Sequence, residues 1–168
     1  ELKTMLSNLE KSSYSYKFLI QDFIPGDDNY MHILTCYVDQ DSKVRFMSFG
    51  HTILEDHGDA AIGNPVAIIN QVDREVMDKS IRFLEETGYT GFANFDIKYD
   101  ERDGKYRYFE INTRLGRSNF YITGSGFNAV KWIVDDLIYH KEFDDEIVIA
   151  DNENLYTVVP KSIVLAYC

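Results

Sequence analysis

Apolar residues recur along the chain with two different periods, one typical of helices and the other of strands. The helical period predicts helices over residues 1–11, 72–87 and 128–140. Runs of apolar residues bounded by turn residues predict strands over residues 16–23, 30–38, 43–49, 147–150 and 156–167. Residues 51–71 contain two glycines and a proline, and residues 115–126 are rich in glycine and serine, so both segments are predicted to be irregular. This order of elements is typical of an α/β protein.

The most informative pattern is a predicted β-hairpin near the middle of the chain, formed by residues 96–99 and 108–112 around a short charged turn. Side chains alternate across a strand, so residues two apart share a face. On the first strand the polar residues that share a face are Asn94, Asp96 and Lys98. On the second strand the corresponding set is Tyr108, Glu110 and Asn112.

The register of this hairpin decides whether the two polar sets meet, because a slip of one residue sends a set to the opposite face. A two-residue loop at Asp103–Gly104 would place Asp96 opposite Ile111. A three-residue loop over residues 102–104, with its glycine in the left-handed conformation, places Asp96 opposite Glu110. The three-residue loop is the favoured prediction, because it accounts for the carboxylates chemically.

Two carboxylates that converge on one face of a sheet repel each other unless a cation or a proton lies between them. In the favoured register Asn94 also faces Asn112, so amide oxygens join the carboxylates. Carboxylate and amide oxygens together with substrate phosphates are typical ligands of Mg²⁺. The hairpin therefore predicts a site for a metal and a nucleotide, and the alternative is a solvated polar face on an exposed hairpin.

Composition narrows the class of protein. The 168 residues are 45% hydrophobic and 14% aromatic, which excludes a disordered segment. A net charge of -11 argues against a general nucleic-acid or anionic-membrane surface. The sequence has no apolar run of transmembrane length and no visible signal peptide. Cys36 and Cys168 have neither metal-ligand spacing nor the density of a disulfide scaffold, so a cytoplasmic location is expected.

A second chemical feature is the predicted strand that ends at Pro25–Gly26 and is followed at once by Asp27 and Asp28. The main chain of such a strand end can pair with the edge of an adenine, and an acid beyond the turn can accept from ribose hydroxyls. An acid-rich turn after a strand is also a common solvated loop. His51 and His57 flank another acidic segment, which is predicted to be a mobile loop rather than a metal site because the spacing matches no standard site.

Together the two features resemble the ATP-grasp superfamily, over about residues 16–140. The segment Gln-Asp-Phe-Ile-Pro-Gly-x-Asp at 21–28 precedes two strands and a helix, and Asp96 is followed fourteen residues later by Glu-x-Asn-x-Arg at 110–114. The resemblance implies an α+β fold with a mainly antiparallel sheet and flanking helices. The run from Glu110 is most similar to bacterial carboxylate–amine ligases of the D-aspartate ligase type, and a carbamoyl-phosphate-synthase-like relative is the alternative.

The resemblance also implies roles for individual residues. The cofactors would be ATP and Mg²⁺ (or Mn²⁺), with the metal held by Asp96, Glu110 and Asn112. The residues that would bind the nucleotide are Gln21, Asp22, Phe23 and Ile24 on adenine and Asp28 on ribose. The catalytic residues would be Arg114, which faces the carboxylate substrate or its acyl phosphate, and Arg117, a second candidate for an anionic substrate.

The implied activity is the ATP-dependent activation of a carboxylate as an acyl phosphate, which an amine then attacks. The expected domains are residues 1–50 as the remainder of the small ATP-grasp subdomain, 51–140 as the subdomain with the metal site, and 141–168 as a C-terminal strand extension. Expected partners are carboxylate and amine substrates, a missing N-terminal lobe of the same protein, and a second copy in a homodimer, with no nucleic acid and no membrane.

The sequence also departs from the superfamily pattern. Family members carry a lysine and a glycine-rich loop over the phosphates, upstream of the adenine strand, and only about fifteen residues precede that strand here. The chain is therefore expected to be the C-terminal portion of a ligase and to be inactive alone. The alternatives are a non-catalytic nucleotide-binding or regulatory module derived from ATP-grasp, and a plain interaction domain.

Overall fold

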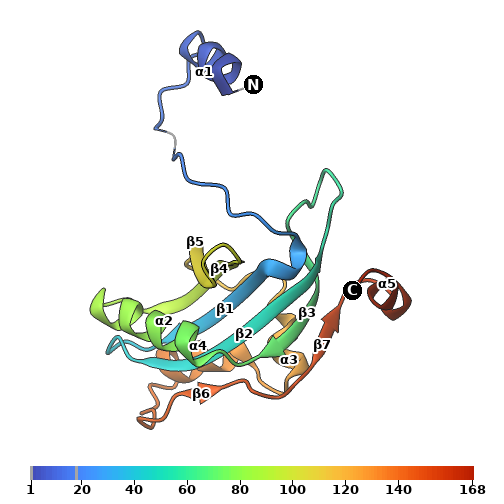
Figure 1. The fold of residues 1–168 in the computed structure, drawn as a ribbon. Coiled ribbons are helices and arrows are strands. Elements are labelled where there is room, and N and C mark those ends of the chain that lie inside the picture. Colours follow the sequence, from blue (N-terminus) through green and yellow to red (C-terminus); the bar gives the residue numbers. More distant parts are fainter. Residues whose placement is uncertain (1, 18) are drawn as a thin grey trace.

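A computed structural model describes residues 2–17 and 19–168 (Figure 1). Within this part of the chain, seven strands form one sheet with β5-β4-β1-β2-β3-β7 as neighbours, and β6 pairs with β2. All pairs are antiparallel except β2–β6. The strands are β1 (Met31–Val38), β2 (Val44–Glu55), β3 (Pro65–Gln71), β4 (Gly91–Asp100), β5 (Lys105–Asn112), β6 (Val148–Ile149) and β7 (Leu155–Thr157). The helices are α1 (Leu2–Glu10), the 3-10 turn η1 (Asp28–Tyr30), α2 (Arg74–Glu86), α3 (Phe120–Gly124), α4 (Ala129–Leu137) and α5 (Lys161–Tyr167).

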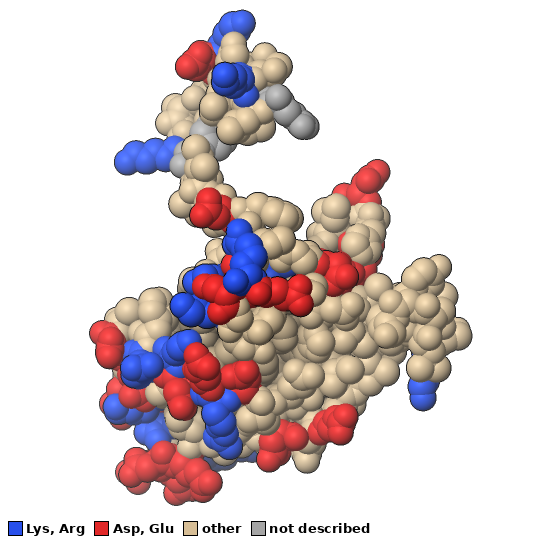
Figure 2. Space-filling model, viewed as in Figure 1, with Lys and Arg blue, Asp and Glu red and all other residues tan. Residues whose placement is uncertain are grey.

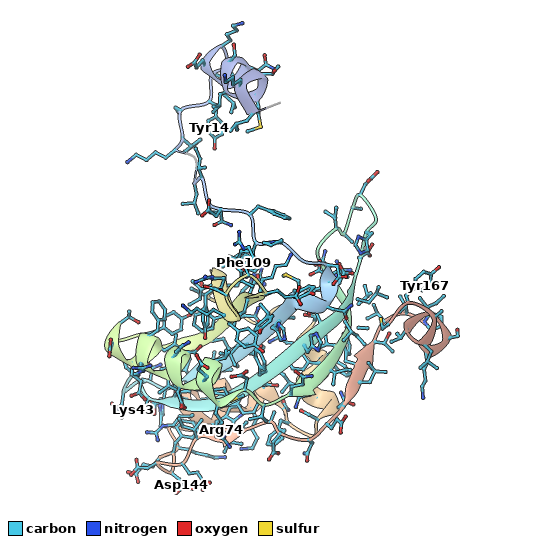
Figure 3. The ribbon with its side chains drawn as sticks, viewed as in Figure 1. Tyr14, Lys43, Arg74, Phe109, Asp144 and Tyr167 are labelled. Atoms are coloured by element: carbon cyan, nitrogen blue, oxygen red, sulfur yellow. The ribbon has the colours of Figure 1, made fainter. Side chains whose placement is uncertain are left out.

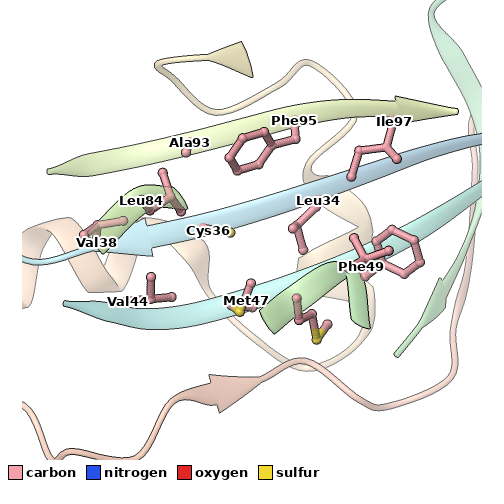
Figure 4. Packing of buried hydrophobic residues seen from close by; sticks show 12 residues of the cluster. Leu34, Cys36, Val38, Val44, Met47, Phe49, Leu84, Ala93, Phe95 and Ile97 are labelled. Carbon is pink, nitrogen blue, oxygen red and sulfur yellow. The ribbon is translucent and has the colours of Figure 1, made fainter. Parts of the chain in front are cut away.

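The central strands have helices on both faces, because both sets of alternating side chains on β1 are mainly apolar. Leu34 and Cys36 belong to a core cluster that includes Met77 and Leu84 of α2 (Figure 4). Side chains of the opposite face, such as Tyr37, pack with residues of α3 and α4. The prediction of a mainly antiparallel sheet with flanking helices is confirmed.

Helix α2 lies close to its predicted position and has clear start and stop signals. The Asp73 carboxylate accepts a hydrogen bond from the Val76 N–H, which caps the first turn. Gly88 follows the helix with φ of +66°, a conformation that a helix C-terminus favours in glycine. Val76 and Leu84 are buried, whereas Val72 precedes the cap and is 40% exposed.

Helix α4 confirms the third predicted helix, and Asn128 caps it by accepting from the Val130 N–H. Trp132 stacks on Phe46 with ring centroids 5.4 Å apart, as expected for a core side chain. Val130 points away from the core, since this side chain is 51% exposed.

Three segments differ from the sequence prediction. Residues 56–64 are irregular as predicted, but residues 51–55 and 65–71 are not, because β2 continues to Glu55 and pairs with β3, and register shifts in this pairing interrupt the alternation. The loop over residues 115–126 contains α3, a short helix that depends on burial of Tyr121 and Ile122 rather than on local propensity. In the tail, β7 ends at Thr157 and Pro160 precedes α5, so a single strand over 156–167 is wrong.

The strand predicted over residues 16–23 is absent from the described residues of this segment, and residue 18 lies outside them. Leu19 and Phe23 are 85% and 81% exposed, so they bury too little surface to hold a strand in place, although Lys98 Nζ lies 5.6 Å from the centroid of the Phe23 ring. The segment joins α1 to η1, and α1 buries none of its described side chains in the sheet (Figure 1).

The boundary predicted between residues 50 and 51 falls within β2, so the sheet continues across it, and the division into domains stays a prediction. On the face drawn in Figure 2, basic and acidic side chains of the described residues are interspersed. Each helix in the described part of the chain is too short or too polar to cross a lipid bilayer.

The hydrogen bond between Tyr37 on β1 and Asp136 on α4 joins the sheet to its helical layer. The Tyr37 hydroxyl donates to Asp136 Oδ2 at 2.6 Å, and both residues are buried. Tyr37→Phe is expected to lower the free energy of unfolding by about 1–3 kcal/mol, because the Asp136 carboxylate loses a donor in a buried place. Urea denaturation measures this change. Tyr139→Phe, at an exposed tyrosine, is the matched control, and equal losses in both variants would contradict the prediction.

Candidate functional site

The candidate site is a cavity of about 480 Å³ on the side of the sheet covered by α3. Its walls come from β1 to β5, from β7 and the residue after it, from the loop after β2, and from the loop over residues 113–118. The lining side chains that carry charge or a side-chain amide are Glu55, Asp56, Asn64, Asn94, Asp96, Glu110, Asn112, Arg114 and Arg117. The cavity therefore combines carboxylates, amides and guanidinium groups from segments far apart in the sequence.

Asp96 and Glu110 are direct neighbours across β4 and β5, and Asn94 is opposite Asn112. The predicted meeting of the two polar sets is confirmed at these positions. The alternative register, with Asp96 opposite Ile111, is wrong.

The turn that produces this register differs from the prediction. Asp100 pairs with Lys105, so the loop contains the four residues 101–104 rather than three, and Gly104 has φ of +69°. A bulge then leaves Phe109 without a partner on β4, between the Ile97–Tyr108 and Asp96–Glu110 pairs. Phe109 lies on the edge strand of the sheet (Figure 3). The longer loop shifts the pairing by one residue, and the bulge shifts it back, so that Asp96 is opposite Glu110 as predicted.

Because of the bulge, Tyr108 and Glu110 lie on opposite faces of the sheet, so the prediction that they share a face is wrong. The Tyr108 hydroxyl bonds with Ser80 Oγ at 3.1 Å and donates to Val76 O at 2.9 Å, so this side chain points toward α2. Glu110 lines the cavity on the other side of the sheet. The Tyr108 ring packs edge-to-face on Phe95, with ring centroids 5.6 Å apart.

Asp96 has an unfavourable environment for its negative charge. Burial and the nearby Glu110 raise the pKa of Asp96 from its ordinary value of 3.8 to about 6. Arg114 and a hydrogen bond from Asn112 Nδ2, at 3.3 Å from Asp96 Oδ2, act in the opposite direction. Within the described residues, no group of three His, Cys, Asp or Glu side chains converges as a metal site, so the candidate ligand set is two carboxylates and one amide.

Arg114 and Arg117 both line the cavity from the loop after β5. Arg114 donates to Leu115 O at 3.1 Å and to Asn112 Oδ1 at 3.4 Å. In the described part of the chain, neither guanidinium forms a salt bridge, although the protein carries a net charge of -11. Both side chains are exposed enough to meet an anionic ligand.

Glu55 is a functional candidate that the sequence prediction missed. It ends β2 and lines the cavity, and its Oε1 is buried without a hydrogen-bond partner among the described residues. Burial, followed by the charge of Asp28, raises the pKa of Glu55 to about 7. Its segment was predicted to be irregular, so the pattern held no signal that a strand would carry this acid into a cavity.

The predicted nucleotide residues are not brought to the cavity. Asp28 Oδ2 accepts from the Glu55 N–H and pairs with His57 Nε2, both at 2.8 Å, so this carboxylate supports the end of β2. Residues 21–24 lie in the exposed segment before η1 and do not line the cavity. Lys98, which was expected on the carboxylate face, donates to Gly26 O at 2.7 Å. The roles of residues 21–24 and Asp28 stay predictions.

Three buried side-chain atoms of the described residues have no hydrogen-bond partner: Thr52 Oγ1, Glu55 Oε1 and Asn119 Oδ1. Thr52 and Glu55 line the cavity, and Asn119 lies against Gly116 of its rim. Buried polar atoms are normally paired, so this concentration at one place is the mark of a site built to receive a ligand.

Comparison with known proteins agrees with this geometry. Residues 38–131, more than half of the chain, match the family described as carbamoyl-phosphate synthase L chain, ATP binding domain. D-aspartate ligase of Enterococcus faecium (strain Aus0004) is 42% identical over 170 residues, covering 99% of this chain. The chain spans 40% of that relative's length.

Two solved structures have a similar fold. Biotin carboxylase of Campylobacter jejuni, in a complex named for β-γ-ATP, is 15% identical and has a TM-score of 0.55 over 80% of this chain and 29% of its own. The biotin carboxylase domain of Hydrogenobacter thermophilus 2-oxoglutarate carboxylase, solved with MgADP, ADP and bicarbonate, is also 15% identical, with a TM-score of 0.52 over 70% of this chain and 26% of its own. These likenesses show the fold alone. The resemblance seen in the sequence is confirmed, and the chain belongs to the ATP-grasp superfamily, in the family of the carbamoyl-phosphate synthase L chain ATP-binding domain.

Proposed function

We propose that this chain is part of an ATP- and Mg²⁺-dependent ligase that joins a carboxylate to an amine, with D-aspartate as the carboxylate substrate. The observation that carries the proposal is the Asp96–Glu110 pair, which shares one cavity with Asn112 and two arginines that lack salt bridges in the described residues. The similarity to D-aspartate ligase supports the choice of substrate.

The residues present fit a magnesium ion. Asp96, Glu110 and Asn112 would hold it, because a hard cation favours carboxylate and amide oxygens. The raised pKa of Asp96, about 6, supports this assignment, since burial and the charge of Glu110 disfavour its carboxylate more than Arg114 favours it, and a bound cation would reverse that balance. When bound, the ion neutralises charge on the phosphates of the nucleotide. Mn²⁺ accepts the same ligands.

Arg114 and Arg117 would hold the carboxylate that is to be activated. In the proposed reaction a carboxylate oxygen attacks the γ-phosphorus, the bond to ADP breaks, and an acyl phosphate forms. The amine then attacks the carbonyl carbon, and phosphate leaves. Both partners of the first step are anions, so a guanidinium aimed at the carboxylate offsets their repulsion and fixes its orientation.

Glu55 is proposed, in addition to Asp28, as an acid that accepts hydrogen bonds from the ribose hydroxyls. Glu55 lines the cavity and has a carboxylate oxygen with no partner among the described residues, whereas the Asp28 carboxylate already accepts two hydrogen bonds. The backbone of residues 21–24 stays the proposed contact for adenine. A cytoplasmic location and a homodimer remain proposals as well.

The first test removes one carboxylate of the Asp96–Glu110 pair. Glu110→Gln in the full-length gene product is expected to lower kcat/KM about 100-fold or more, because the site loses one of its two carboxylates. The assay is formation of a hydroxamate from D-aspartate, ATP and hydroxylamine, and calorimetry with Mg²⁺ and a non-hydrolysable ATP analogue measures binding. Glu86→Gln, at an exposed acid on α2, is the control. Nucleotide binding without turnover in the wild type would favour the non-catalytic module, and no binding would contradict the proposal.

The second test uses the pKa of Asp96. The folded protein keeps this proton up to about pH 6, and the unfolded chain releases it near the ordinary value of 3.8, so the ligand-free protein loses stability as the pH rises between these values. Asp96→Asn is therefore expected to stabilise the ligand-free protein by about 1–2 kcal/mol near pH 7, a figure reduced for the partial exposure of Asp96. The gain should vanish near about pH 4.

Urea unfolding of ligand-free protein at the two pH values measures this effect. Asp78→Asn, at an exposed acid on α2, should change stability at neither pH. A loss of stability in Asp96→Asn near pH 7 would show that the carboxylate is a structural group rather than a site for a cation.

The third test compares the 168-residue chain with the full-length gene product. The chain spans 40% of its D-aspartate ligase relative, and the phosphate-covering lysine and glycine-rich loop of the superfamily are expected upstream of the adenine segment. We expect no sustained hydroxamate formation by the 168-residue chain, in contrast to the full-length product. Repeated turnover by the 168-residue chain would contradict this expectation.

A further inference from the structure

A series of hydrogen-bonded, buried polar side chains links β1 and β4 to Asn119. This residue follows the loop over residues 113–118, which carries Arg114 and Arg117 and is called the arginine loop below. Asn119 Nδ2 donates to Thr35 Oγ1 at 2.6 Å, and the Thr35 hydroxyl donates to Asn94 Oδ1 at 2.9 Å. All three residues are buried: Asn119 is 8% exposed, Thr35 0% and Asn94 4%. Because a hydroxyl has a single hydrogen, Thr35 uses it toward Asn94 and serves Asn119 as an acceptor.

Both ends of this series adjoin the candidate site. Asn94 lines the cavity, pairs with Asn112 across the two strands, and lies two residues before Asp96. Asn119 directly follows the loop over residues 113–118, which carries Arg114 and Arg117, and directly precedes α3. A connection from β4 to this loop therefore runs beneath the cavity, through Thr35.

Gly116 brings the loop backbone onto the same group of side chains. A Cβ at Gly116 would collide with Asn119 Oδ1 and would lie 3.1 Å from Asn94 Oδ1, so only glycine allows the backbone to approach this closely. The Asn119 N–H also donates to Gly116 O at 3.3 Å. The middle of the arginine loop thus rests on the two amides that Thr35 connects.

We propose that Thr35, Asn94 and Asn119 form a positioning network that fixes the arginine loop relative to the metal-site strands β4 and β5. The placement of the loop follows from the contacts above, and its consequence for catalysis rests on the proposed function. A guanidinium fork recognises a carboxylate only in one orientation, so a loop free to shift would bind substrate more weakly.

The first experiment compares Thr35→Val with Thr35→Ser in the full-length gene product. Valine preserves the shape but leaves Asn94 Oδ1 and Asn119 Nδ2 without their partner, whereas serine keeps the hydroxyl. Thr35→Val is expected to raise KM for D-aspartate about tenfold or more in the hydroxamate assay and to leave the affinity for a Mg²⁺-bound ATP analogue unchanged. Thr35→Ser should restore the wild-type KM.

Ser48→Ala is the matched control, because Ser48 Oγ and Asn70 Oδ1 form a comparable buried bond at 3.1 Å that does not reach the arginine loop. A thermal melt of each variant measures the general loss of stability. A KM for D-aspartate in Thr35→Val equal to that of the wild type, or an equal rise in Ser48→Ala, would overturn the catalytic consequence.

The second experiment measures how accessible the arginine loop is to a protease and needs no activity assay. Trypsin cleaves after arginine, so cleavage after Arg114 and Arg117 reports on the loop, and cleavage after Arg102 in the β4–β5 turn is the internal reference. Thr35→Val is expected to be cut about tenfold faster in the loop and at the wild-type rate at Arg102. Gly116→Ala, which disturbs the contact from the loop side and leaves β1 intact, should give the same pattern if Thr35→Val does not fold.

Wild-type cleavage rates in the loops of both variants, or equal acceleration at all three arginines, would overturn the positioning network. If the wild type forms no hydroxamate but the loop of Thr35→Val is cut selectively, the proposed function fails and the network stands. If the wild type is active and the loop is cut at an unchanged rate, the network fails and the proposed function stands.

Discussion

The candidate site depends on one local constraint, the bulge at Phe109 in the pairing of β4 with β5. The turn of this hairpin begins with Asp100 opposite Lys105, and a regular ladder from there would place Asp96 opposite Phe109. Glu110 would then share a face with the side chains that pack on α2. The extra residue at Phe109 turns Glu110 to the cavity and leaves Tyr108 against α2. A single unpaired residue therefore brings the two carboxylates together.

That arrangement works against the stability of the ligand-free protein. Asp96 is partly buried beside a second acid, and Glu55 is another acid with a raised pKa that lines the same cavity. The buried polar atoms at this place that have no partner among the described residues lower the stability further. Burial of apolar side chains on both faces of the sheet offsets this loss, because β1 and β2 supply core residues to α2 on one side and to α3 and α4 on the other. A strained cluster inside a well-packed sheet is typical of a binding site.

The site has two parts that reach the cavity by different routes. The carboxylates stand on β4 and β5, whose positions are set by backbone hydrogen bonds. The arginines stand on a loop, and side-chain contacts through Thr35 and the close approach at Gly116 place that loop. In the proposed ligase both parts would serve one reaction: the strands would face the metal and phosphates, and the loop would face the carboxylate.

The sequence by itself determined the local elements and the chemistry of the hairpin. Asp73 and Gly88 mark the ends of α2, and the spacing from Asp96 to Glu110 and Asn112 led to both the metal hypothesis and the family. Only the tertiary structure decided the bulge at Phe109, the extension of β2 to Glu55, the helix α3 and the absence of a strand in the described residues of 16–23. The physical reason is the separation along the sequence of the residues that interact. Caps and alternation act between residues a few positions apart, whereas a bulge, a strand partner or a buried short helix is stabilised by contacts with distant parts of the chain.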